Sequence, residues 1–277
     1  MRKTQLYLTV FTLFLFAGTL CYGQEKVDRV TVPFSNPSKP GLVKAHTYNG
    51  GITVKGYNGK EVIIEARLRG KILTEKKKIS EKAKGMRLIQ TRTTGLSVVE
   101  EDNVMSINVE SQKKTVDLTI QVPFSTSLKL HSYKNGDITV DKVNGEIEVE
   151  HYKGELKFTD VSGAVVAHAY SGNITVTFVK VHPEKPMSFS NWKGDIDVTF
   201  PANINASLKM KSDRGEIYSD FDLKIMPTPQ EALKGTRKKD GKFRLSIGQF
   251  IYGTINGGGP EYHFKTYSGD ILIRKAK

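Results

Sequence analysis

The stretch HSYKNGDITVDKVNGEIEVEHYKGELKFTDVSGAVVAHAYSGNITV (131–176) carries a glycine every nine residues, at positions 136, 145, 154, 163 and 172. Between the glycines, apolar residues alternate with polar ones, as in Ile138/Val140 and Ile147/Val149. This alternation predicts a strand with one buried face, and a glycine after a short polar residue predicts a tight turn. A strand and a turn in each nonapeptide predict a β-solenoid, whose coils bury their apolar faces only by stacking on one another.

A second period overlies the first. The residue two positions before each glycine alternates between valine and tyrosine, in the order Val143, Tyr152, Val161 and Tyr170. The fold predicted from this pattern is all-β, a two-sided β-solenoid of about 18-residue coils with two strands and two unlike corners. The aromatic half of the unit recurs at 43–64, 187–200, 208–221 and 262–273. The outlying segment TEKKKISEKAKG (74–85) predicts one short helix in the N-terminal third.

The N-terminus predicts export. Two basic residues precede an apolar run from Leu6 to Ala17, which is too short for a stable membrane span and is typical of a secretory signal peptide. Cleavage after Gly23 would leave residues 1–23 as the signal peptide and 24–277 as a single solenoid domain. A lipoprotein interpretation of Cys21 is disfavoured, because a lipobox needs an apolar residue three positions earlier and a small residue just before the cysteine. Here the sequence has glycine and leucine, the reverse order.

The chain after Gly23 contains no cysteine, which excludes disulfides, thiol chemistry and cysteine metal sites. Its 40 basic and 29 acidic residues give a net charge of +11, which favours anionic neighbours such as phospholipid, lipopolysaccharide or acidic polysaccharide. The alternative is that a basic chain is only kept soluble by its charge. No other stretch is apolar enough to span a membrane, so we expect an exported protein of the periplasm, the cell surface or the extracellular space.

Several stretches together resemble a known family. TVDLTIQVPFSTSLKLHSYKNGDITV (115–140), DVSGAVVAHAYSGNITV (160–176) and KTYSGDILIRKAK (265–277) are similar to the bacterial "putative adhesin" family of secreted β-strand-repeat domains. Val122, Pro123, Leu128 and Leu130 match the opening strand of that family, and 135–140 matches its recurring N-G-D-I-x-V coil. The resemblance covers essentially the whole chain after the signal peptide. It implies the solenoid fold with an early helix, and it brings no catalytic residues because the family has none established.

The residues themselves predict no enzyme, cofactor, metal site or nucleic-acid partner. Calcium β-rolls need G-G-x-G-x-D, whereas each repeat here has one glycine and a varying residue after it. The chain lacks the nucleophile elbow, the H-E-x-x-H helix, the P-loop and a dinucleotide fingerprint after a strand. A polysaccharide-acting enzyme would have to assemble carboxylates across coils, for example from Asp141, Glu148 and Glu150.

The candidate site is the aromatic corner. By the alternation, one aromatic residue per coil points outward, with Asp213 interrupting the series: Tyr48, Tyr133, Tyr152, Tyr170, Trp192 and Tyr267. A flanking polar column, two positions earlier in each coil, contains His46, His131, Glu150, His168, Lys211 and Lys265. Tyr and Trp are enriched in binding surfaces, and sugar rings stack on them. The competing interpretation is that the corner rings pack on each other to seal the turn against water.

From these residues we predict a non-enzymatic, adhesin-like protein of the cell envelope. It would bind an anionic polymer or glycan, or another envelope component, through the aromatic ladder. The alternative is a periplasmic scaffold or signalling protein that acts through protein–protein contacts at its open ends or strand edges. The third possibility is a polysaccharide-acting enzyme.

Overall fold

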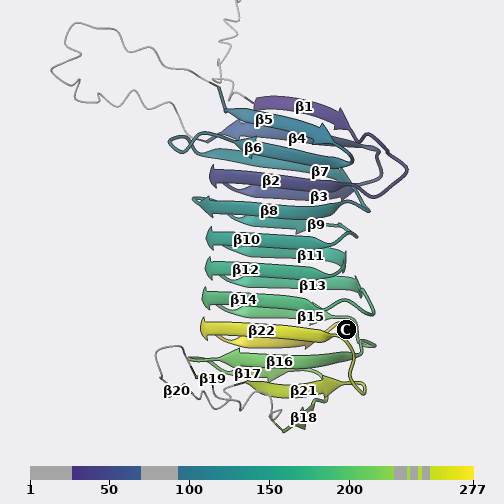
Figure 1. Ribbon diagram of the computed structural model, residues 1–277, viewed down its shortest axis with the longest axis vertical. Helices are drawn as coiled ribbons and strands as arrows, with labels where there is room; N and C mark the ends of the chain where they lie inside the picture. Colours follow the sequence, from purple (N-terminus) through teal and green to yellow (C-terminus); the bar gives the residue numbers. More distant parts are fainter. Residues whose placement is uncertain (1–26, 70–92, 228–235, 238–242, 245–249) are drawn as a thin grey trace, which may run out of the picture.

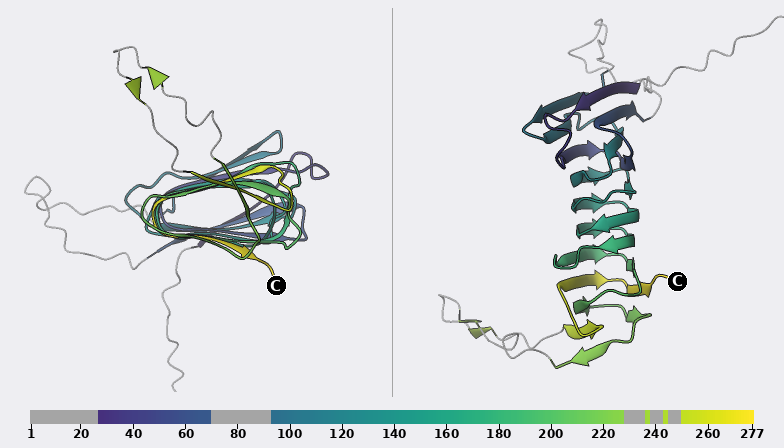
Figure 2. Two further views of the ribbon diagram at one scale, coloured as in Figure 1. Left: turned by 90° about the horizontal axis from the view of Figure 1, so that it is seen from below. Right: turned by 90° about the vertical axis from the view of Figure 1, so that its right-hand side faces the viewer.

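The strands form two sheets that lie back to back as the two faces of one flattened solenoid (Figures 1 and 2). The computed structural model describes residues 27–69, 93–227, 236–237, 243–244 and 250–277. Every element within these residues is a strand, which confirms the predicted all-β, two-sided solenoid. The helix predicted at 74–85 and the signal peptide at 1–23 lie outside the described residues. The described part of the chain contains no helix of the length and apolar character needed to cross a membrane.

Each sheet has a defined strand order. Across the ten-stranded sheet the strands are β1 (Val27–Pro33), β4 (Glu61–Leu68), β7 (Val116–Pro123), β3 (Ile52–Tyr57), β9 (Ile138–Asp141), β11 (Leu156–Gly163), β13 (Ile174–Val181), β15 (Ile196–Phe200), β23 (Ile271–Lys275) and β17 (Ile217–Ser219). Across the eleven-stranded sheet they are β18 (Lys224–Met226), β21 (Ile251–Ile255), β16 (Ala206–Ser212), β22 (Glu261–Ser268), β14 (Met187–Lys193), β12 (Val165–Ser171), β10 (Ile147–Lys153), β8 (Ser127–Lys134), β2 (Leu42–Asn49), β6 (Val104–Val109) and β5 (Leu96–Glu101). A separate pair joins β19 (Thr236–Arg237) to β20 (Phe243–Arg244).

The regular coils stack in parallel register. Leu156 pairs with Ile138 and with Ile174, 18 residues away on either side, as the sequence period predicts. Alternate residues of each strand point inward, so that like side chains form continuous apolar columns between the two sheets. Each fully buried Val, Ile or Leu contributes about 1.5–3 kcal/mol of transfer free energy, and the parallel strands can recover it only inside the stack. The core therefore runs the length of the solenoid.

The end coils do not follow the order of the chain. The C-terminal coil, β22 and β23, is inserted between the coil of β14 and β15 and the coil of β16 and β17 (Figure 1). The first regular coil, β2 and β3, is likewise inserted between the strands β6 and β7 and the strands β8 and β9. Neighbours in the stack are therefore not always neighbours in the sequence.

The two corners of each coil are built differently. At the valine corner, Val143 and Val161 are fully buried. At the aromatic corner, glycines take backbone conformations with positive φ, for example Gly154 at 145° and Gly172 at 130°. A Cβ atom at Gly154 would lie 2.3 Å from the carbonyl oxygen of Gly136 on the preceding coil, and one at Gly172 would lie 1.9 Å from that of Gly154. The recurring glycine is therefore required both by the backbone conformation and by the close approach of stacked coils.

Candidate functional site

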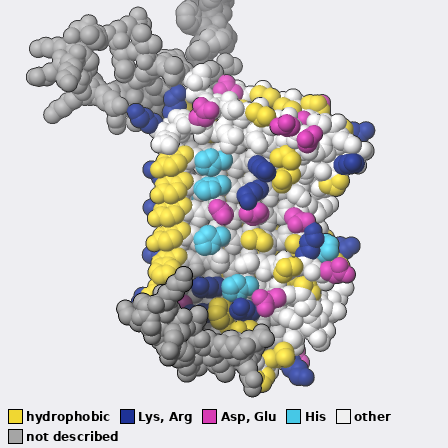
Figure 3. All heavy atoms as spheres, viewed as in Figure 1, with side chains coloured by type: hydrophobic (Ala, Val, Ile, Leu, Met, Phe, Trp, Pro, Cys, Tyr) yellow, Lys and Arg dark blue, Asp and Glu magenta, His cyan; other side chains and the backbone are white. Residues whose placement is uncertain are grey.

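Six aromatic side chains form one unbroken stack along the aromatic corner, which we call the aromatic ladder (Figure 3). The ring centroids are 4.9 Å apart for Tyr48–Tyr133, 4.6 Å for Tyr133–Tyr152, 4.7 Å for Tyr152–Tyr170, 6.4 Å for Tyr170–Trp192 and 4.1 Å for Trp192–Tyr267. Neighbouring rings are nearly parallel, with interplanar angles between 7° and 18°. The structure thus brings together all six aromatic residues predicted for the site.

Asp213 does not interrupt the ladder, contrary to the prediction. The sequence places it between Trp192 and Tyr267, but the inserted C-terminal coil puts Tyr267 directly beside Trp192. The coil that carries Asp213 comes after this inserted coil in the stack. Its Arg214 lies over the ring of Tyr267, 4.9 Å from the centroid, as a cation–π contact at the end of the ladder.

The ladder presents ring edges rather than ring faces. Within the stack, each face is occupied by the neighbouring ring, so a sugar cannot stack on it as expected from the sequence. The rings nevertheless remain substantially in water: Tyr152, Tyr170 and Trp192 are 42%, 45% and 49% exposed. A ligand along this corner would therefore meet a row of aromatic edges spaced like the strands themselves.

The corner is sealed from within by a separate set of residues. Directly inside the ladder lie buried or half-buried polar side chains whose donors bind corner carbonyls: Ser132 Oγ donates to Gly50 O at 2.8 Å, Asn191 Nδ2 to Gly194 O at 2.9 Å and Ser212 Oγ to Gly269 O at 2.8 Å. These bonds satisfy backbone groups that the tight turn would otherwise leave unpaired.

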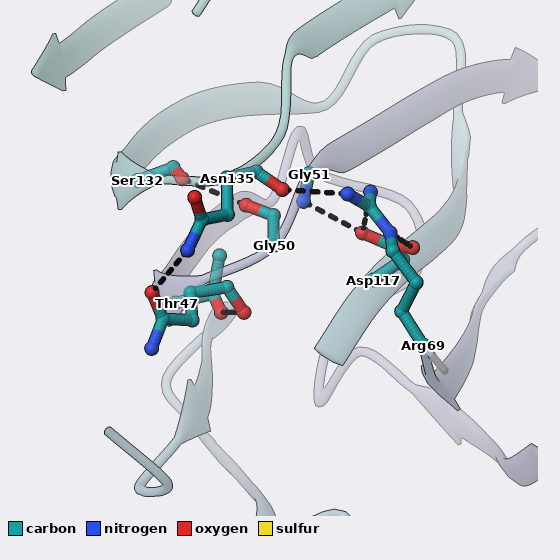
Figure 4. Close-up of polar contacts among 8 residues, drawn as sticks. Thr47, Gly50, Gly51, Arg69, Asp117, Ser132 and Asn135 are labelled. Carbon is teal, nitrogen blue, oxygen red and sulfur yellow. Dashed lines mark hydrogen bonds and ion pairs between the residues drawn. The ribbon is translucent and has the colours of Figure 1, made fainter. Parts of the chain in front are cut away.

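Figure 4 shows this inner network at the coil that begins the ladder. Asn135 Nδ2 donates to Asn49 Oδ1 at 3.0 Å, and the Gly51 amide donates to Asp117 Oδ1 at 2.8 Å. Arg69 holds Asp117 through two nitrogens and also donates to Asn135 O at 2.7 Å. The guanidinium thus ties together three segments that are far apart in the sequence, which fixes the backbone beneath the first rings.

His151 is the one large member of the inner set. It is almost fully buried, and its Nδ1 lies 2.8 Å from the carbonyl oxygen of Ser132. Burial lowers the pKa of His151 below its usual range, although the carbonyls of Ser132 and Gly136 act in the opposite direction. Protonation of this side chain would place a charge inside the corner.

The flanking polar column predicted from the sequence also forms (Figure 3). In stacking order it consists of His46, His131, Glu150, His168, Ser190, Lys265 and Lys211. The two lysines follow in the reverse of their sequence order, again because of the inserted C-terminal coil. In the described part of the chain, no group of three or more His, Cys, Asp or Glu side chains is arranged to hold a metal ion.

A second flank of the ladder was missed by the sequence analysis. The residue directly after the aromatic is Lys134, Lys153 or Lys193 in three of the coils, and these lysines lie on the other side of the ring stack. Lys134 Nζ is 5.3 Å from the ring centroid of Tyr48. The signal was present in the repeat, because the position after the corner aromatic is lysine in three coils and a small polar residue in the other three.

The polar residue after each corner glycine has a structural role. Asp137 Oδ1 accepts a hydrogen bond from the backbone amide of Glu155 at 2.9 Å, and Glu155 Oε2 accepts one from Asn173 at 3.0 Å. The pattern continues from Asn173 to Asp195 and on to Asp270, each at 2.8 Å. These side chains join successive coils, which explains why the residue type varies while an acceptor is kept.

The carboxylates considered for a polysaccharide-acting site do not converge. Asp141 lies on the ten-stranded sheet, whereas Glu148 and Glu150 lie on the eleven-stranded sheet, and all three point away from the core. Glu148 Oε1 is also engaged by Lys129 Nζ at 2.8 Å. The pair of carboxylates that glycoside hydrolysis requires on either side of one bond is therefore not assembled from these residues.

Two depressions lie at the opposite ends of the strands from the ladder. One, of about 620 Å³, is lined by residues of β8, β10 and β12 and contains the ion pairs Lys129–Glu148 and Lys185–Glu146. The other, of about 540 Å³, is lined by Val179, Ile204 and the fully buried Tyr262. Burial raises the pKa of Tyr262 to about 12, so the phenol stays neutral. Neither depression brings together catalytic groups of complementary roles.

Comparison with known proteins agrees with this architecture. The chain aligns over 91% of its length with the whole of a solved protein described as a "putative cell adhesion protein" from Clostridium sporogenes ATCC 15579, with a TM-score of 0.51 and 13% identity. A "putative adhesin" from Bacteroides fragilis NCTC 9343 aligns over 90% of this chain and 97% of its own, with a TM-score of 0.30 and 11% identity. At 13% identity, the likeness to the Clostridium sporogenes protein concerns the fold alone. No curated protein sequence matches the chain.

The family itself is established by sequence. Residues 43–274, from the first regular strand to the last, match the family described as Toastrack DUF4097. This match confirms the resemblance inferred from the repeated N-G-D-I-x-V coils and explains why it extends over both inserted end coils. The chain belongs to the Toastrack DUF4097 family.

Proposed function

We propose that this protein is a non-enzymatic, exported, adhesin-like protein that binds an anionic polymer or glycan of the cell envelope along the aromatic ladder. The observation that carries the proposal is the six-ring stack, which lies outside the hydrogen-bonded inner residues of the corner and in which Tyr152, Tyr170 and Trp192 are 42%, 45% and 49% exposed. The solvent-exposed edges of these rings are accessible to a ligand. The cell-adhesion description of the Clostridium sporogenes protein is consistent with this class of function.

The geometry favours a linear ligand that lies parallel to the solenoid axis. Tyr and Trp edges offer a rigid amphipathic surface whose ordering costs little conformational entropy on binding. Lys134, Lys153 and Lys193 along one side would pair with carboxylate or sulfate groups of the ligand. Within the described residues, neither Lys153 nor Lys193 takes part in an ion pair, so both ammonium groups are available.

The test is binding of the protein to dextran sulfate, alginate and uncharged dextran, followed through the fluorescence of Trp192. This is the only tryptophan of the chain and a member of the ladder, so a change in its emission reports contact at the proposed site. We expect a charged polymer to change the emission and binding to persist at physiological salt. A change in emission that disappears at physiological salt would show that the interaction is only nonspecific charge attraction, which would contradict the proposal.

A matched pair of variants locates the binding surface. Substitution of Tyr152, Tyr170 and Trp192 together by Ser should weaken binding, measured by calorimetry, by about tenfold or more, because aromatic anchors dominate interface energetics. The control replaces the exposed apolar residues Val166, Val179 and Tyr218 by Ser and should bind like the wild type. If the ladder variant fails to fold, the rings act as the seal of the corner and the proposal is wrong.

A second candidate function rests on the edge strand β18. Among the described strands it pairs with β21 alone, and its Ile225 and Met226 are 60% and 48% exposed. An exposed edge can accept a strand from another protein, as the scaffold alternative requires. Concentration-dependent association that persists in the ladder variant, measured by analytical ultracentrifugation, would favour this function; a monomer at all concentrations would count against self-association through the edge.

A further inference from the structure

Three histidines and one glutamate form a continuous row beside the first four rings of the ladder. The register pairs His46 with His131, His131 with Glu150 and Glu150 with His168, on four successive coils. The rings of His46 and His131 are 4.9 Å apart at an interplanar angle of 84°. His131 Nδ1 lies 3.8 Å from Glu150 Oε2, and His168 Nδ1 lies 2.8 Å from Ser190 Oγ. All four side chains are exposed to solvent.

The charge of this row depends on pH. With neutral imidazoles, Glu150 gives the row one negative charge; with three imidazolium groups, the row carries two positive charges instead. Histidine is the side chain whose charge changes near physiological pH, with an unperturbed pKa of about 6.5. Protonation of the three imidazoles therefore reverses the sign of the row, directly beside the proposed contact surface.

The charged groups around the row do not cancel this change. The next column of the same face contains Lys44 and Lys129, and Lys129 is paired with Glu148 at 2.8 Å. Further along that column, His263 is half-buried beside Phe250, and burial lowers its pKa. Burial also lowers the pKa of His46, and the charge of His131 lowers it further.

The far side of the ladder carries a constant charge. Lys134, Lys153 and Lys193 stand there at every physiological pH. At neutral pH, an anionic chain along the rings would have lysines on one flank and a carboxylate on the other. In acid, both flanks would be positive, and the ring stack would lie between two rows of positive charge.

We propose that the ladder and this row form one contact surface for a polyanion bearing carboxylate or sulfate groups, and that protonation of His46, His131 and His168 strengthens its binding. The inference rests on the proposed function and adds its regulation. The inference identifies the ligand class by its charge, because the affinity for an uncharged polymer would not change with the charge of the row.

The experiment measures the affinity for dextran sulfate and for uncharged dextran at pH 7.5 and 5.0, at constant ionic strength, with Trp192 emission as the readout. For the wild type, we expect the Kd for dextran sulfate to fall by about tenfold at pH 5.0, because three exposed charges are each worth a small ion-pair energy. Uncharged dextran should show no such change. Circular dichroism at both pH values verifies that the protein is folded.

Two matched variants identify the responsible side chains. Replacing the three histidines of the row by Gln should remove most of the gain in affinity between pH 7.5 and pH 5.0. Replacing them by Lys should give tight binding at both pH values. His182→Gln, at the opposite corner, should keep the wild-type response.

The outcomes separate the two proposals. Binding of equal strength at both pH values, or a pH response that survives in the Gln variant, would overturn the role of the histidine row while leaving the ladder function intact. Absence of dextran sulfate binding at both pH values would overturn both. Binding that persists, by calorimetry, after replacement of Tyr152, Tyr170 and Trp192 by Ser would place the ligand elsewhere.

Discussion

The two corners of the solenoid close the turn between the sheets with different side chains. At the valine corner, Val143 and Val161 turn inward and are fully buried, so that apolar side chains close the turn. At the aromatic corner, small polar residues such as Ser132 close the turn by binding backbone carbonyls, and the rings lie outside them. Both corners keep water from the core, but only one of them also exposes a continuous aromatic surface.

The difference shows how one position of a repeat can stabilise the fold and also offer a surface for binding. A buried corner valine contributes through the area that it removes from water, and nothing of it remains accessible. A corner tyrosine contributes about 0.5–1.5 kcal/mol per stacking contact and keeps its edge in solvent. Selection for a surface can therefore act on the aromatic corner without disturbing the closure of the coil, and each prediction below tests this division.

The largest effect is expected from a charge in the valine corner. Val161→Asp should destabilise the protein by about 3–5 kcal/mol or prevent folding, because an unpaired carboxylate would be buried among apolar side chains. The matched variant at the other corner, Tyr170→Asp, should cost about 1 kcal/mol, because the side chain remains in water. Urea denaturation followed by circular dichroism measures both. Equal losses at the two corners would contradict the division.

A corner glycine should be nearly as sensitive. Gly154→Ala places a Cβ atom 2.3 Å from Gly136 O at a φ of 145°, so we expect a loss of about 3 kcal/mol in unfolding free energy. Gly257→Ala also has a positive φ but meets no atom within 4 Å, and it should cost about 1 kcal/mol. Similar melting temperatures for the two variants would show that coil contact at the aromatic corner is unimportant.

Acid should act on the aromatic corner through His151. Burial lowers the folded-state pKa of His151. Below about pH 6.5, the imidazole therefore takes up a proton more readily in the unfolded chain than in the folded chain. The unfolding free energy is unaffected above that pH and falls as the pH drops towards the folded-state pKa. The melting temperature of His151→Ser should depend less on pH between 7.5 and 5.0 than that of the wild type. The variant His168→Ser, at an exposed position, should keep the wild-type dependence. An unchanged dependence in His151→Ser would assign acid sensitivity to other groups.

The smallest effect is expected from one ring. Tyr152→Leu removes two stacking contacts, at 4.6 and 4.7 Å, and should cost about 1 kcal/mol in urea denaturation. Tyr152→Phe keeps the ring and should be neutral within about 0.5 kcal/mol, because the side chain is exposed. A loss of several kcal/mol in Tyr152→Leu would make the ladder part of the corner seal.

Much of the candidate site could be predicted from the sequence because it repeats. Once the alternation assigns Ile147 and Val149 to the inside, Glu148, Glu150 and Tyr152 must lie outside, and the same holds in each regular coil. The ladder and the histidine row follow directly. The lysines beside the ladder are equally visible in the repeat, because each directly follows a corner aromatic.

The error over Asp213 has a different origin. The order of coils in the stack differs from their order in the sequence, and the period cannot reveal that β22 pairs with both β14 and β16. The role of the residue after each glycine was also hidden. Asp137, Glu155 and Asn173 differ in type, and only the geometry shows that each accepts a backbone amide from the next coil.

The sequence by itself determined the all-β solenoid, its coil length, its two unlike corners and which side chains face outward, because these are local consequences of a period of two within a period of about 18. The tertiary structure alone decided which coils are neighbours, and so whether six rings make one ladder or two. Pairing between distant strands depends on how the ends of the chain fold back into the stack. Such long-range contacts leave no trace in a local repeat, since equivalent coils present nearly equivalent edges to one another.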